Sequence, residues 1–105
     1  MTLGGGHYDV ARVGLLVQRG RVIATKRVVQ WLSNHEYDAA AKMREVLAAI
    51  DEDATFVKSC ILDNEETADV YIVRLPDDDW YLKFWIDEDN LMVDVWSCWW
   101  DGAAH

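Results

Sequence analysis

Three side chains of the segment 80–86 place a phenol, an ammonium group and an indole at alternate positions. The even positions of WYLKFWI are all apolar, whereas the odd positions are Tyr81, Lys83 and Trp85. Successive side chains of a strand point to opposite faces, so the even set should face a core and the odd set an open surface. Such a surface can contact a protein or stack on bases.

The stretch LMVDVWSCWW, residues 91–100, also divides into two alternating sets. Its odd positions are richer in valine, which predicts that they face the core. Trp96 and Trp100 then lie on the open side near Trp85, where the three would form an aromatic platform for binding. The alternative is that a terminal tail or a loop covers them.

Residues with metal-binding chemistry are too scattered to predict a metal or cofactor site. Cys60 and Cys98 lack CxxC spacing and nearby histidines, so we expect reduced, packed thiols. The acidic runs 77–79 and 87–90 lie where turns are expected, without the spacing of a calcium loop.

Charge is distributed unevenly along the chain, whose net charge is −9. Residues 1–50 contain seven Lys/Arg and four Asp/Glu, a net charge of +3, and residues 51–105 contain three and fifteen, a net charge of −12. An acidic half repels anionic ligands and attracts cationic ones. This half is therefore expected to bind RNA poorly, because RNA binding rests on neutralising phosphates with Lys and Arg.

A length of 105 residues predicts one domain, over residues 7–105, preceded by MTLGGG (1–6) as a flexible leader. No apolar run approaches the roughly 18 residues of a membrane span, and no signal peptide is recognisable, so we expect a cytoplasmic protein.

Apolar periodicity predicts helices first and strands afterwards. Caps at Asp9 and Asp38 begin the first and third helices, and the second extends from Thr25 to about Asn34. Short apolar runs separated by acidic turns then predict antiparallel strands. The expected fold is α+β, with three N-terminal helices packed on a C-terminal four-stranded antiparallel sheet, its strands at 55–62, 69–75, 80–86 and 91–99.

The order of short motifs along the chain resembles the MqsR family. HYDV, VLAAI, FVKS, DVY, YLK and a final LxVxxxS-like strand follow one another between His7 and about Trp99. Members are toxins of bacterial toxin–antitoxin pairs that cleave mRNA without a metal and are neutralised by an antitoxin. The resemblance implies a RelE-like fold, mRNA as substrate and a cognate antitoxin as partner.

Two of the four positions that the family ties to activity are kept. The resemblance assigns catalytic roles to Lys58, in FVKSC, and to Tyr81, in YLK, with Lys83 behind it. The family's glutamine falls on Ala68 and its last lysine on Trp99, so both are lost. Each lost electrostatic partner costs about 10²–10³ in rate, and Arg74 or Lys83 are the candidates to substitute.

Two functions of different class follow from these observations. The first is an MqsR-like toxin, a metal-independent mRNA endoribonuclease whose site is altered at two positions. The alternative is an acidic, non-catalytic protein that binds a basic partner or imitates nucleic acid. In that protein Trp85, Trp96 and Trp100 would be apolar anchors within a charged rim.

Overall fold

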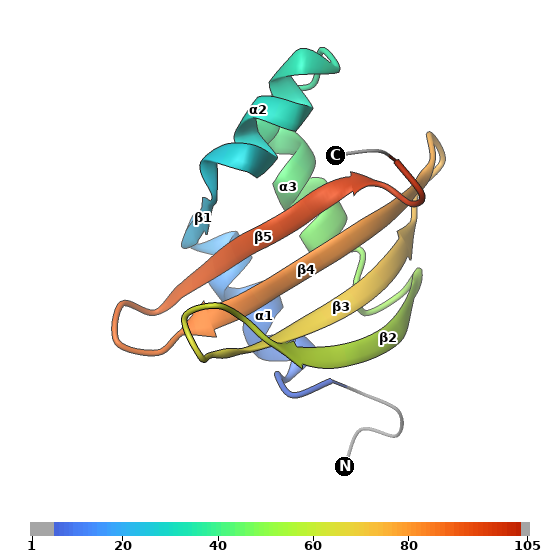
Figure 1. Cartoon of the computed structure of the whole chain (residues 1–105). Helices are drawn as coiled ribbons and strands as arrows, with labels where there is room; N and C mark the ends of the chain where they lie inside the picture. The colour runs from blue at the N-terminus through green and yellow to red at the C-terminus, as the bar shows by residue number, and fades with distance from the viewer. Residues whose placement is uncertain (1–5, 104–105) are drawn as a thin grey trace.

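The computed structural model describes residues 6–103 and folds them into three helices and one five-stranded sheet (Figure 1). The three helices come first, with one short strand between the first and the second, and four consecutive strands follow. In chain order the elements are α1 (Val10–Gln18), β1 (Val22–Ala24), α2 (Lys26–Asn34), α3 (Ala39–Ala48), β2 (Ala54–Ile61), β3 (Thr67–Arg74), β4 (Asp79–Asp87) and β5 (Met92–Trp100).

The sheet has the order β1-β5-β4-β3-β2, and it corrects the predicted four-stranded antiparallel sheet. The expected meander from β2 to β5 is present, but β1 adds a fifth strand that pairs in parallel with β5. β1 has only three residues, and its register joins Val22 to Val93 across 71 positions of sequence. A strand that short has no measurable alternation of its own, so its pairing depends on tertiary contacts.

Within residues 6–103, α1 and α3 lie on one side of the sheet and α2 extends beyond its β5 edge, so no described helix covers the other side (Figure 1). We call this second surface the open face. The even positions of β4 face the helices as predicted, since Trp80, Leu82, Phe84 and Ile86 are all at most 1% exposed. They pack with the apolar sides of α1, α2 and α3 into one core.

Local signals fix the helix boundaries where the sequence predicts them. Asp9 and Asp38 cap α1 and α3, with side-chain oxygens that accept backbone N–H groups, and Thr25 does the same for α2. Gly20 follows α1 with φ +71°, a left-handed conformation that favours glycine, and the Arg21 N–H bonds back to the Leu16 carbonyl.

A buried carboxylate attaches the start of the chain to the sheet. Asp69 of β3 is 0% exposed and accepts hydrogen bonds from the His7 and Tyr8 N–H groups and from the Ser59 hydroxyl. Gly6 lies so close that a Cβ there would be 2.2 Å from the carboxylate. The predicted leader otherwise concerns residues 1–5, which lie outside the described residues.

Replacing Asp69 by alanine is expected to lower the free energy of unfolding by about 2–4 kcal/mol, because three donors lose their acceptor together. Urea unfolding measures the effect. Asp63→Ala removes the same charge from an exposed turn and should change stability by less than about 0.5 kcal/mol. Equal effects of the two variants would show that the anchor contributes nothing.

The two cysteines differ in reactivity. Burial raises the pKa of the Cys98 thiol to about 12, whereas Cys60 is partly accessible on β2. At pH 8 only about 10⁻⁴ of Cys98 would be thiolate, the reactive form. A chromogenic disulfide reagent should therefore label one thiol of the folded protein and two after denaturation. Rapid labelling of folded Cys60→Ser would contradict this assignment.

Candidate functional site

A β-bulge in β2 turns Lys58 toward the open face. Phe56 pairs with Tyr71 and packs against it on the helix side, with ring centroids 5.4 Å apart. In a regular strand Lys58 would point the same way as Phe56. The register shifts between these two residues, because Val57 is an extra residue, so Lys58 pairs with Val70 on the opposite surface.

A second bulge, in β5, reverses the direction of the side chains that follow it. Lys83 pairs with Ser97 while Phe84 pairs with Val95, which leaves Trp96 as the extra residue. After Trp96, each residue of β5 therefore points to the face opposite to the one that strict alternation predicts. Ser97 and Trp99 therefore lie with Lys83 and Tyr81 rather than with the core side of β4.

Because of this bulge, the prediction that Trp100 belongs to the aromatic platform of the open face is wrong. Trp100 pairs with the buried Trp80 and packs on the helix side, in edge contact with Trp31 at 4.9 Å between centroids. Its indole N–H donates to the Tyr37 hydroxyl at 3.1 Å. Trp85 and Trp96 remain half-buried on the open face, where the Trp85 N–H donates to Asp94 at 3.1 Å.

Three of the four predicted catalytic residues lie close together on the open face. Lys58 and Lys83 flank Val70 from either side, so their Cα atoms are two strand spacings, about 10 Å, apart. Tyr81 lies two residues from Lys83 along β4, roughly 7 Å away. Side chains of this length can reach one phosphodiester together.

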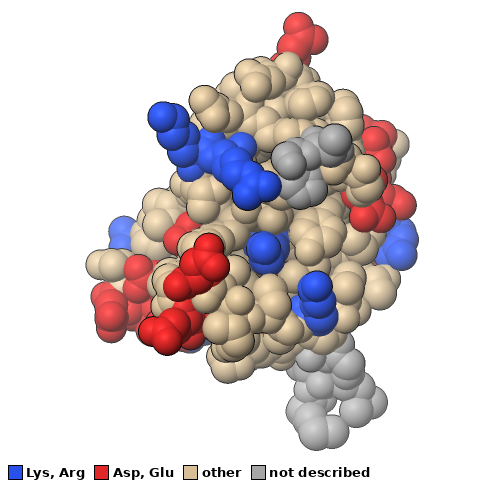
Figure 2. All heavy atoms as spheres, viewed as in Figure 1, with Lys and Arg blue, Asp and Glu red and all other residues tan. Residues whose placement is uncertain are grey.

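The fourth predicted catalytic residue, Arg74, lies on the open face but farther along β3. It pairs with Asp79, and its guanidinium donates to the Thr55 hydroxyl at 2.8 Å. All three basic residues of the acidic half of the chain therefore share one surface. In Figure 2 basic atoms lie across the middle of this surface, and acidic atoms lie over its left part and right margin.

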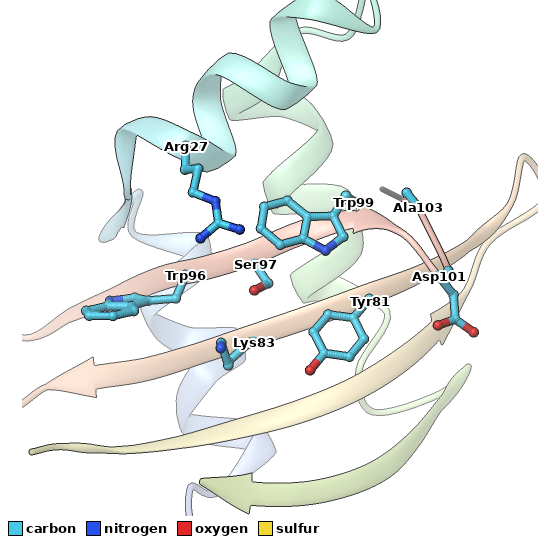
Figure 3. Close-up of a pocket in the computed structure, with 9 residues that line it drawn as sticks. Arg27, Tyr81, Lys83, Trp96, Ser97, Trp99, Asp101 and Ala103 are labelled. Atoms are coloured by element: carbon cyan, nitrogen blue, oxygen red, sulfur yellow. The ribbon is translucent and has the colours of Figure 1, made fainter. Parts of the chain in front are cut away.

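A pocket of about 460 Å³ opens on this surface beside the C-terminal half of β5 (Figure 3). Arg27 enters it from α2, Lys83 from β4, and Ser97 lies between them. Trp96 stands at one end and Asp101 at the other, with Tyr81 nearer to Asp101. The size is that of a site for a small ligand or for one unit of a polymer.

Arg27 was not predicted from the sequence, because it belongs to a helix far from the strands in sequence. Its guanidinium carbon lies 5.4 Å from the centroid of the Trp99 ring, a cation–π arrangement. Trp99 is the position at which the family resemblance expects a lysine. A positive charge is thus present beside residue 99, although another element supplies it.

Two cations of residues 6–103 form ion pairs with carboxylates, and both lie away from the open face. Arg12 pairs with Glu88, and Lys42 pairs with Glu45 and Asp77. Lys58, Lys83 and Arg27 form no ion pair within residues 6–103. Lys58 and Lys83 flank Val70, and Arg27 and Lys83 line one pocket, so positive charge gathers where an anion could bind.

The Tyr81 hydroxyl is a proton donor at neutral pH. Burial raises the pKa of this phenol above its usual value of 10.0, and electrostatic repulsion from neighbouring groups, Asp101 among them, raises it further. The protonated form therefore persists throughout the physiological range. Among the two roles open to a tyrosine, donor or base, the structure favours the donor.

Among residues 6–103 no group of three His, Cys, Asp or Glu side chains is placed to hold a metal ion. The helices described are also too short to cross a membrane. Comparison with protein-family models, curated proteins and solved structures finds no match to this chain.

Proposed function

We propose that the open face binds single-stranded RNA and that the protein cleaves it without a metal, as an MqsR-like toxin would. The observation that carries this proposal is the convergence of Lys58, Tyr81 and Lys83 on one uncovered surface, achieved through a bulge in β2. Two ammonium groups and a protonated phenol are the groups that phosphodiester cleavage needs at phosphorus and at the leaving oxygen.

The proposed reaction is an internal transesterification. The 2′-oxygen attacks phosphorus and loses its proton to water, while the bond from phosphorus to the 5′-oxygen breaks. Lys58 and Lys83 neutralise the charge that develops on the phosphorane oxygens. Tyr81 donates its proton to the leaving 5′-oxygen and regains one from water. The products are a 2′,3′-cyclic phosphate and a 5′-hydroxyl.

The lost family positions affect this proposal unequally. Ala68 lies on β3, is 0% exposed and supplies no polar group in place of the glutamine. The lysine missing at Trp99 is partly compensated by Arg27, whose charge lies over that ring. Cleavage is therefore expected to be about 10²–10³ slower than with the family's glutamine in place, because nothing replaces that glutamine at Ala68.

The proposal is tested by incubating the purified protein with single-stranded RNA in the presence of a chelator and analysing the product ends. Lys58→Ala should lower the cleavage rate at least about tenfold, because phosphorane charge is less well neutralised. Arg44→Ala is the matched control, since Arg44 is an exposed cation of α3, a helix on the other side of the sheet. Equal rates for wild type and both variants would rule out catalysis on the open face.

The toxin assignment also implies a cytoplasmic location and a cognate antitoxin. Induction in a bacterium should slow growth and degrade transcripts, and coexpression of an antitoxin should reverse both effects. Lys58→Ala should relieve the growth defect without loss of the folded protein. Persistence of the defect in that variant would assign the toxicity to something other than RNA cleavage.

A second candidate function is favoured by one end of the sheet. The turns 62–66 and 88–91 meet there, and Glu66, Asp87, Glu88 and Asp89 line a common hollow of about 160 Å³ with Trp85. We propose this acidic end as a docking place for a cationic segment of a protein partner. A synthetic Lys/Arg-rich peptide should bind with strongly salt-dependent affinity, and Asp89→Lys should weaken it. Binding unaffected by salt would contradict the proposal.

A further inference from the structure

The pocket between α2 and β5 contains groups to which the proposed reaction assigns no step. Arg27, Ser97 and Trp96 all line it and lie on the side away from Asp101 (Figure 3). Ser97 is only 4% exposed, yet its hydroxyl faces the pocket. A buried hydroxyl between two cations is suited to an oxygen-rich anion.

The two cations approach this point from different elements. Arg27 projects from the first turn of α2 and Lys83 from the middle of β4, and both point toward the space above Ser97 (Figure 3). The Arg27 side chain lies over the Trp99 ring at 5.4 Å, which limits its motion. Its planar guanidinium can donate to two phosphate oxygens, and Lys83 adds a second charge.

Trp96 provides a flat wall beside this anion position. It is the extra residue of the β5 bulge, so its side chain joins that of Ser97 at the pocket rather than alternating with it. The ring is half-buried and remains partly accessible. Stacking on such a ring is available to any base, because every base has a π-face.

We infer that this pocket is a nucleotide subsite for single-stranded RNA, in which Arg27, Lys83 and Ser97 hold a phosphate and Trp96 stacks with the adjoining base. The inference rests on the proposed function for the identity of the polymer. It gives binding roles to Ser97 and Trp96, which have no part in the reaction, and it makes the Arg27 charge a ligand of the bound phosphate. Recognition of the base is expected to be tolerant of sequence, since stacking carries it.

The test is a titration with a 2′-deoxy heptanucleotide, which has no 2′-hydroxyl and cannot be cleaved, followed by tryptophan fluorescence at several salt concentrations. Arg27→Gln should weaken binding about tenfold and lower the slope of log K against log [salt] by about 0.7, the value for one neutralised phosphate. Lys26→Ala, the matched control, removes the neighbouring exposed charge of α2 and should leave the slope unchanged.

The stacking part is tested separately with Trp96→Ala and Trp96→Phe. Trp96→Ala should weaken binding roughly ten- to a hundredfold, and Trp96→Phe should restore most of it. Identical affinities for these variants and wild type, or equal salt slopes for Arg27→Gln and Lys26→Ala, would overturn the subsite. Failure of RNA cleavage with normal binding of the heptanucleotide would instead refute the proposed catalysis and leave the subsite intact.

Discussion

Tyr81→Phe is expected to lower the rate of RNA cleavage by about 10²–10³, while affinity for RNA stays within a few fold of wild type. The substitution removes one hydroxyl and keeps the ring that covers the sheet beside Ile72 and Trp99. If the phenol protonates the leaving 5′-oxygen, its loss acts on the transition state and not on binding. Single-turnover kinetics with saturating protein measure the chemical step separately from binding.

The pH dependence distinguishes a donor from a base. The pKa of Tyr81 is raised above 10.0 by burial, so the phenol remains protonated between about pH 6 and pH 9. The ratio of wild-type to Tyr81→Phe rates should therefore be constant over that range. A ratio that climbs about tenfold per pH unit would show that the phenolate is the active form, and it would reverse the assigned role.

Trp80→Ala is expected to lower the free energy of unfolding by about 3–5 kcal/mol and Tm by more than about 12 °C. Trp80 is 0% exposed, and its ring meets Trp31 and Tyr37 in edge contacts at 6.1 and 5.2 Å between centroids. The Lys42 ammonium lies 5.2 Å from the ring, and the indole N–H donates to Asp77 at 3.3 Å. Truncation would leave a large cavity where α2, α3 and β4 meet.

Trp85→Ala is the matched control for this measurement, because it truncates the same residue type on the same strand. Trp85 lies on the open face and is half-buried, so its loss should cost only about 1–2 kcal/mol. Urea denaturation of the two variants gives both values under one set of conditions. Comparable losses would show that the open face is packed as tightly as the helix side, which would also remove it as a binding surface.

Features set by neighbouring residues were predictable from the sequence. The caps at Asp9 and Asp38 and the apolar stripe of α3 depend on contacts within one turn or two of helix. The faces of β4 follow from strict alternation, so the core position of Trp80 and the open position of Tyr81 and Lys83 could be derived from the sequence. The resemblance added Lys58, which no periodicity would have selected.

Tertiary structure alone decided where the two faces exchange. A bulge adds one residue to a strand and reverses every side chain beyond it, and nothing in the local pattern marks Val57 or Trp96 as that residue. The position of Trp100 was therefore mistaken, while the open position of Lys58 depends on an irregularity that alternation cannot show. Local sequence patterns could not predict the pairing of β1 or the position of Arg27 either, because both contact β5 from distant parts of the chain.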